Sequence, residues 1–178
     1  MTKARPAEIG AFFLLIILYV GIRLYGLTST CLWFDEIFGV HAAEHSWDQI
    51  IPFISLDLIH PPLFYVLLKL WISLGGEGLL WLRIFSVLFA SATVAPFLGI
   101  CAELRLHRRI QAMALLLLAV NGQLIKYAQE VRMYSLLLFL SLLSIWLFFR
   151  YLRGRSGTVP LLIVNTLLVY THYFGWLV

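Results

Sequence analysis

Charged side chains are scarce in this sequence, at 12% of its 178 residues, whereas a soluble domain carries about 25%. Apolar side chains reach 62%, and the mean hydropathy is +0.93. These values exclude a soluble globular domain, a disordered tail and a coiled coil. Thirteen basic and nine acidic residues leave a formal net charge of +4, with no basic stripe on a water-soluble surface. A conventional nucleic-acid binder is therefore excluded as well.

Cysteine is nearly lacking too. The sequence has two, Cys31 and Cys101, and they fall in regions that we expect on opposite sides of a membrane. This number and placement exclude a disulfide framework and say little about the redox compartment.

Long apolar runs take the place of charge. The first, residues 9–27, spans nineteen residues and as a helix would reach about 28 Å, close to a hydrocarbon core of ~30 Å. Lys3 and Arg5 precede it and no small-residue cleavage site follows, which favours an uncleaved first span over a removed signal peptide. Further runs lie at 80–102, 110–128, 133–149 and 159–178. We predict an all-α, polytopic transmembrane protein with about five spans.

The segment between the first two runs has a different composition. Residues 28–79 hold six acidic side chains, one lysine and no arginine. Inside it, the apolar stretch 63–74 is twelve residues long and carries Lys69 in its middle. As a helix it would reach about 18 Å, which is too short to cross a bilayer. We predict membrane-parallel helices in this loop.

Basic residues gather in three places: the N-terminus, residues 104–109 and residues 150–155. The positive-inside rule puts all three in the cytoplasm, and the loops 28–79 and 129–132 outside. Five spans satisfy this pattern as long as 63–74 does not cross. The last run is still apolar at Val178, which predicts an N-terminal fragment or a truncated product.

Two adjacent carboxylates, Asp35 and Glu36, follow the first span at the outer membrane surface. Such a pair suits a general base or a cation site. The alternative is a solvated acidic pair at a helix N-terminus, where the dipole favours negative charge.

Cations on the same side run against the usual charge bias. Arg83, Lys126 and Arg132 lie at outer ends of predicted spans, which suggests a bound anion such as a phosphate. The alternative is that they snorkel to the membrane edge.

Three weaker patterns complete the set. His60-Pro61-Pro62 suits the start of a helix, and His172 lies in an aromatic belt at the end of the last run. The third, residues 41–45, matches the H-x-x-E-H pattern of zinc peptidases. A metallopeptidase would need a third ligand, and the alternative is the polar face of an interfacial helix.

In this order, LWFDE, HPPLFYVLLKLW, LRIFSVLFAS, IKYAQEVRMYSLLLFL and YTHYFG resemble the N-terminal half of the C-type glycosyltransferases. The resemblance is to the bacterial branch related to protein O-mannosyltransferases and lipid A aminoarabinose transferases, and it runs from about residue 8 to the chain end. It implies a polytopic fold with membrane-parallel helices in the first outer loop, so residues 1–178 would be the N-terminal part of such a domain.

The resemblance also implies an activity and a location. Family members move a sugar from a polyprenyl-phosphate donor to a lipid, glycan or protein acceptor on the extracytoplasmic side of the inner (plasma) membrane. It makes Asp35, with Glu36 beside it, the catalytic base or acceptor-orienting group, and Glu130 a metal-site candidate for Mg²⁺ or Mn²⁺. In the family the HPP segment and the arginine that opens the second span line the donor site, which here are His60, Pro61, Pro62 and Arg83. We predict Lys69, Arg132 and His172 as further donor-binding residues. The rival interpretation is a non-enzymatic membrane protein, such as a lipid-phosphate translocator or a scaffold subunit.

Overall fold

The computed structural model describes residues 6–57 and 60–178, so the predicted N-terminal cations Lys3 and Arg5 lie outside the described residues. Every regular element of the described residues is helical, which confirms the all-α prediction. In chain order the helices are α1 (Pro6–Leu24), α2 (Phe34–Glu44), α3 (Ile50–Asp57), α4 (Leu63–Gly75), α5 (Leu79–Ala92), α6 (Val94–Glu103), α7 (Arg108–Val120), α8 (Gly122–Gln129), α9 (Tyr134–Leu152), α10 (Thr158–Thr171) and the short 3₁₀ helix η1 (Tyr173–Leu177).

Two helical segments of the described residues are long and apolar enough to cross a membrane: α5 with α6, which run on as Leu79–Glu103, and α9. A third candidate is the pair α7 and α8, if the two form one span despite a 56° bend. The predicted run 159–178 is only partly one helix, because α10 ends after 14 residues. These features are compatible with a membrane protein, and the count of five spans stays a prediction.

The bend between α7 and α8 lies inside the predicted run 110–128. Asn121 there has an extended backbone, and its side-chain oxygen accepts a hydrogen bond from the Leu124 N–H at 3.0 Å. This is an N-cap, so a new helix begins where the prediction had one continuous span. The Asn-Gly pair at 121–122 is a turn signal of the kind that could have indicated the break.

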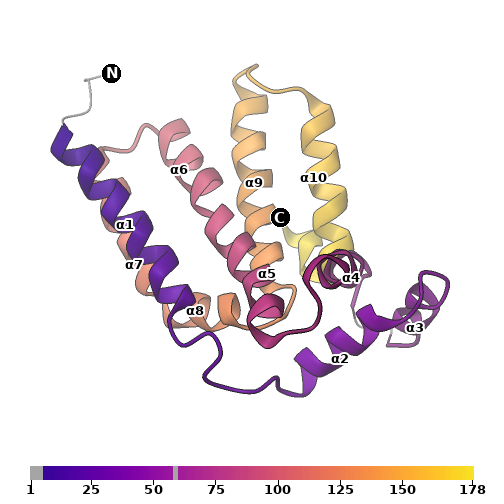
Figure 1. The fold of residues 1–178 in the computed structure, drawn as a ribbon. Coiled ribbons are helices and arrows are strands. Elements are labelled where there is room, and N and C mark those ends of the chain that lie inside the picture. Colours follow the sequence, from indigo (N-terminus) through magenta and orange to yellow (C-terminus); the bar gives the residue numbers. More distant parts are fainter. Residues whose placement is uncertain (1–5, 58–59) are drawn as a thin grey trace.

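The upright helices α1, α5–α6, α7, α9 and α10 stand side by side, and α2, α4 and α8 lie across their lower end (Figure 1). The apolar stretch predicted at 63–74 is α4, seen nearly end-on. The start of α1, the α6–α7 loop and the α9–α10 loop all lie at the opposite, upper end (Figure 1). The basic segments 104–109 and 150–155 therefore share one end of the bundle, as the charge pattern predicts.

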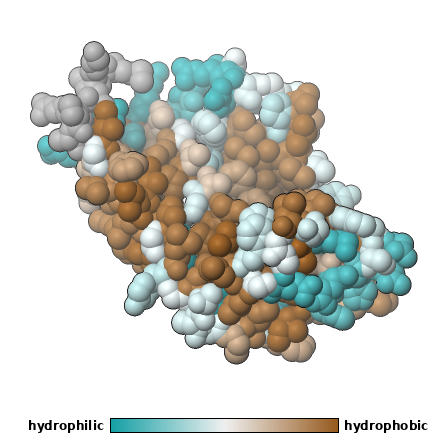
Figure 2. Space-filling model, in the orientation of Figure 1, coloured by the Kyte–Doolittle hydropathy of each residue, from teal (hydrophilic) through white to brown (hydrophobic). Residues whose placement is uncertain are grey.

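The surface follows the same division. Apolar side chains cover much of the upright helices in this view, and hydrophilic ones gather at the upper end and around α2 and α3 (Figure 2). Phe13 and Leu14 on α1 and Leu117 on α7 are each more than 60% exposed. So many exposed large apolar side chains suit contact with lipid.

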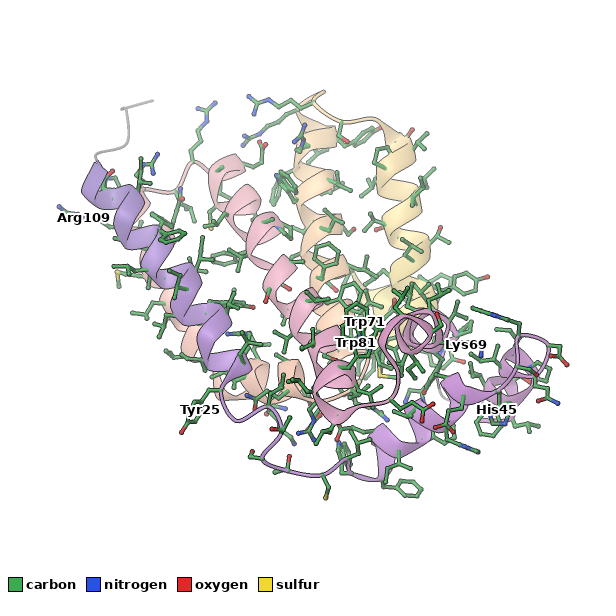
Figure 3. All side chains as sticks on the ribbon, in the orientation of Figure 1. Tyr25, His45, Lys69, Trp71, Trp81 and Arg109 are labelled. Atoms are coloured by element: carbon green, nitrogen blue, oxygen red, sulfur yellow. The ribbon has the colours of Figure 1, made fainter. Side chains whose placement is uncertain are left out.

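The turn from α4 to α5 is closed by two stacked indole rings (Figure 3). The Trp71 and Trp81 rings lie 4.1 Å apart and 8° from parallel. Each indole N–H donates to the other residue's carbonyl oxygen, at 2.8 and 3.0 Å. These two hydrogen bonds and the ring stack fix α4 across the end of α5. α4 in turn packs against α2, where the rings of Phe64 and Tyr65 lie beside Gly39. The N-terminus of α2, where the adjacent carboxylates lie, is thereby held in place.

Candidate functional site

Glu36 is wholly buried and its carboxylate is saturated by groups of this chain. Oε2 accepts the backbone N–H of Trp33 at 3.1 Å, and Oε1 accepts that of Val131 at 2.7 Å. The first bond is the reach of a third-position glutamate back to the start of its own helix. Arg83 completes the set, with Nη2 at 3.4 Å from Oε2. This geometry makes Glu36 a structural carboxylate rather than a base open to a substrate.

Arg83 of α5 is likewise turned inward, with 4% of its surface exposed. Nη1 donates to the carbonyl of Leu27 at 2.8 Å and to the hydroxyl of Thr30 at 3.2 Å. Nη2 donates to the carbonyl of Cys31 at 3.1 Å as well as to Glu36. Arg83 thus ties the α1–α2 loop to α5. Its role as a phosphate ligand stays a prediction.

Asp35 faces a different set of residues. Its carboxylate is 36% exposed and lies 3.3 Å from Nη1 of Arg132, a guanidinium that is 6% exposed. Nη1 also donates to the Asp35 carbonyl at 3.2 Å, and Nη2 lies 3.5 Å from Nε2 of His60. The rings of His60 and His172 are 6.3 Å apart. The structure therefore brings together four of the predicted site residues from four separate segments, a set that we call the Asp35 cluster.

Burial lowers the pKa of His172, which follows α10, and electrostatic interaction with His60 and Arg132 lowers this pKa further. A lowered pKa keeps the imidazole neutral near neutral pH, so that one ring nitrogen is an acceptor. The Asp35 cluster thus combines an accessible carboxylate, a buried guanidinium and a neutral imidazole.

The remaining donor-site candidates lie on α4 or just before it. Pro61 and Pro62 precede the helix, and the Pro62 carbonyl accepts the N–H of Val66 at 3.1 Å, so they set where α4 begins. The Lys69 ammonium binds the carbonyls of Ala43 and His45 and lies 5.1 Å above the Trp47 ring. Lys69 is thus bound to the far end of α2 (Figure 3), about 15 Å of helix from Asp35, and not in the cluster.

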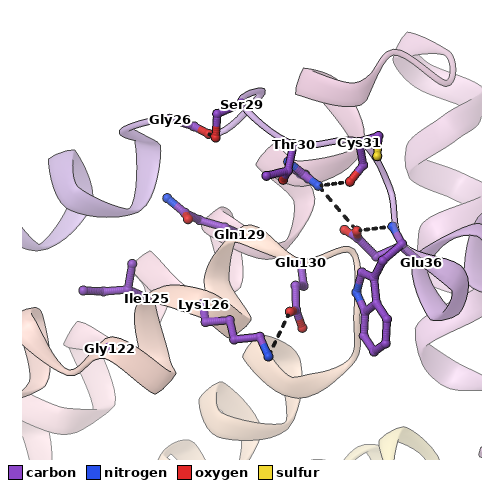
Figure 4. Close-up of a pocket in the computed structure, with 12 residues that line it drawn as sticks. Gly26, Ser29, Thr30, Cys31, Glu36, Gly122, Ile125, Lys126, Gln129 and Glu130 are labelled. Atoms are coloured by element: carbon purple, nitrogen blue, oxygen red, sulfur yellow. Dashed lines mark hydrogen bonds and ion pairs between the residues drawn. The ribbon is translucent and has the colours of Figure 1, made fainter.

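A pocket of about 400 Å³ opens between the α1–α2 loop and α8 (Figure 4). Glu130 and Lys126 enter it, with carboxylate and ammonium 3.7 Å apart. Burial raises the pKa of Glu130, Lys126 opposes the rise, and the carboxylate of Glu36 adds to it. The wall includes Gly26, Ser29, Thr30, Cys31, Trp33, Glu36, Arg83, Gly122, Ile125 and Gln129.

The donor atoms do not fit the divalent cation that the resemblance implies. Over residues 6–57 and 60–178, no group of three His, Cys, Asp or Glu side chains is placed to hold a metal ion. Glu36 is taken by Arg83 and two backbone N–H groups, and Glu130 pairs with Lys126. In the H-x-x-E-H segment, the His41 ring contacts the Glu44 carboxylate at 3.5 Å and the His45 ring at 4.9 Å, again without a third ligand.

The sequence did not predict Gln129 and Val131, whose contacts at the site involve backbone groups. Gln129 binds the end of α1, and the N–H of Val131 binds Glu36. A glutamine side chain or a backbone N–H has no pattern in the sequence that marks such a role. Comparisons of the chain with protein-family models, with curated proteins and with solved structures find no match. A functional assignment therefore rests on the geometry of the site.

Proposed function

We propose that this protein transfers a sugar from a polyprenyl-phosphate donor to an acceptor hydroxyl at the outer face of a membrane. The observation that carries the proposal is the Asp35 cluster: a partly exposed carboxylate lies 3.3 Å from a buried guanidinium, whose other Nη atom faces His60. An acceptor alcohol needs a base and a departing phosphate needs a cation, and the cluster has both within one small site.

The reaction assigns a role to each group. The acceptor oxygen bonds to the anomeric carbon as the bond from that carbon to the phosphate oxygen breaks, through an oxocarbenium-like transition state. The acceptor proton goes to the carboxylate of Asp35, and the lipid phosphate leaves with the bonding electron pair. The fixed positive charge of Arg132 favours the growing negative charge of the leaving group. His60 and His172 line the same site. Nδ1 of His172 accepts the N–H of Phe174, so the neutral ring carries its proton on Nε2 and can donate a hydrogen bond to a sugar oxygen.

The position of the cluster supports an extracytoplasmic site. Asp35 lies in the first turn of α2, at the end of the bundle opposite the two basic loops (Figure 1). With those loops in the cytoplasm, the cluster faces outward. We place the protein in the inner (plasma) membrane, where the family that it resembles uses lipid-linked sugars on the side without nucleotide sugars.

The test is donor consumption by the purified chain in liposomes that contain a polyprenyl-phosphate-linked radiolabelled sugar, with lipid, glycan and peptide acceptors supplied in turn. Asp35→Asn should lower the rate by about a hundredfold or more, the usual contribution of a general base. Glu44→Gln, which removes an exposed carboxylate from the other end of α2, should leave it unchanged. Full activity in Asp35→Asn would contradict the assignment. Donor that crosses the bilayer unconsumed would favour the translocator.

A further inference from the structure

Residues 129–132 form a short strip that leads from the end of α8 towards α9, and each of these residues contacts a different part of the molecule. Gln129 binds the end of α1, and the N–H of Val131 donates to Glu36 at 2.7 Å. The side chain of Glu130 enters the pocket, and that of Arg132 belongs to the Asp35 cluster. Glu130 has an extended backbone and ends α8, and the N–H of Arg132 donates to the Glu130 carbonyl at 2.8 Å, so the chain turns directly after the helix.

The carboxamide of Gln129 acts at the end of α1, where carbonyl groups lack partners within the helix. Its Nε2 donates to the carbonyls of Tyr25 at 2.8 Å, Arg23 at 3.2 Å and Ile22 at 3.4 Å. The last four carbonyls of a helix need such donors from outside it. Gln129 supplies them from a residue 104 or more positions away in the chain.

A side chain of α1 also binds the end of α7. Arg23, fully buried near the end of α1, donates to the carbonyls of Leu118 at 3.2 Å and Ala119 at 3.3 Å, in the last turn of α7. Over the part of the chain that the structure describes, no carboxylate lies within ion-pair distance of Arg23. Its charge therefore rests against the negative end of a helix dipole. Gln129 of α8 thus binds the terminal carbonyls of α1, and Arg23 of α1 binds the terminal carbonyls of α7.

We propose that Gln129 is a positioning residue of the site: by binding the end of α1 it sets the placement of Glu130 in the pocket and of Arg132 beside Asp35. The expected effect of Gln129 on the rate rests on the proposed function, whereas its effect on the placement of Glu130 and Arg132, the geometric part of the proposal, does not. Gln129 and the N–H of Val131 hold the strip on both sides of Glu130, so loss of the first anchor removes the hydrogen bonds that tie the strip to α1. Glu130 and Lys126 lie in the pocket wall next to Gln129 (Figure 4).

The geometric part is tested with two nitroxide spin labels on facing walls of the pocket. One is attached to the exposed Cys31 and the other to Gly122→Cys, where an added Cβ meets nothing within 4 Å. Cys101, which is buried, is replaced by alanine. Gln129→Glu keeps the shape but removes the N–H donors, so the interlabel distance distribution should broaden. Gln129→Lys restores donors and should narrow it again. Gln123→Glu makes the same exchange at an exposed position of α8 and serves as control.

A distribution that stays narrow in Gln129→Glu, or that broadens equally in Gln123→Glu, would overturn the proposal. In the sugar-transfer assay Gln129→Glu should lower kcat on the order of tenfold or more with little change in KM, because a misplaced group costs rate rather than ground-state binding. Gln129→Lys should recover it. If the labels respond as expected but the unsubstituted protein consumes no donor, the proposed function fails while the positioning role stands.

Discussion

At the scale of single residues, Asp35 and Glu36 differ by one position and have opposite environments. The sequence predicts both at the outer membrane surface, and in the structure both lie in the first turn of α2. The structure also shows that the second is wholly buried and the first 36% exposed. The deciding groups are the N–H of Val131 and the guanidinium of Arg83, which are 95 and 47 residues away along the chain. No local pattern reports such distant partners.

We expect Glu36→Gln to destabilise the protein strongly, by about 3–5 kcal/mol, because removal of one charge from a buried ion pair leaves the other without compensation. The orphaned charge is that of Arg83, whose side chain is 5% exposed. Thermal unfolding in detergent measures the loss. Glu44→Gln, whose carboxylate is 41% exposed, is the matched control, and an unfolding midpoint equal to that of the control would show that the buried pair contributes nothing.

Glu130 provides a test by pH. Its pKa is raised above 4.5, chiefly by burial, so the folded state holds this proton more tightly than the unfolded chain. The associated stability is fully present below pH 4.5 and is lost as the pH rises through the folded pKa. Glu130→Gln has no carboxyl group to ionise, so it does not lose this stability as the pH rises. The ion pair with the exposed Lys126, which the variant also lacks, contributes little to the free energy of unfolding. The variant should therefore gain stability relative to the unsubstituted protein as the pH rises to neutral. Unfolding midpoints across that range measure this, with exposed Glu77→Gln as control. Parallel curves would contradict it.

At the scale of elements, the prediction was best where length alone decides. The stretch 63–74 is too short to cross and becomes α4, a separate helix of 13 residues. Length was a poor guide where polar residues interrupt an apolar run. Asn121 caps a new helix within 110–128, and His172 ends α10 by taking an extended backbone and accepting the N–H of Phe174 at 3.1 Å. In each case a side chain satisfies backbone groups locally, which hydropathy does not register.

The α4–α5 turn allows a sharp test of element packing. A Cβ on Gly75 would lie 2.2 Å from the Trp81 ring, so Gly75→Ala must displace that ring from its stack on Trp71. We expect a loss of about 1–3 kcal/mol, typical of overpacking, and a change in tryptophan fluorescence. Gly78→Ala is the control, because a Cβ there meets nothing within 4 Å. An unchanged emission spectrum in Gly75→Ala would show that the stack does not hold the turn.

At the scale of the whole molecule, charge and architecture agree. The α6–α7 and α9–α10 loops hold the basic segments and lie at one end, and α2, α4 and α8 cross the other (Figure 1). Glu103 strengthens the basic end, since its nearly buried carboxylate accepts from Arg153 at 2.6 Å and Arg155 at 3.5 Å. The sequence predicts this polarity because charge bias acts on whole loops. The pairing of side chains within each end depends on helix packing, which the sequence does not display.

The orientation follows as a prediction. Ser46 is exposed in the α2–α3 loop, and Ser156 lies in the α9–α10 loop at the opposite end. In a background without Cys31 and Cys101, a membrane-impermeant maleimide applied to intact cells should label Ser46→Cys. It should label Ser156→Cys only after the membrane is opened, because short loops rich in Lys and Arg stay in the cytoplasm. The unsubstituted cysteine-free protein sets the background. Labelling of both positions from one side would contradict the arrangement. Labelling of Ser156→Cys alone in intact cells would reverse it and turn the Asp35 cluster toward the cytoplasm, where a lipid-linked donor on the outer leaflet is out of reach.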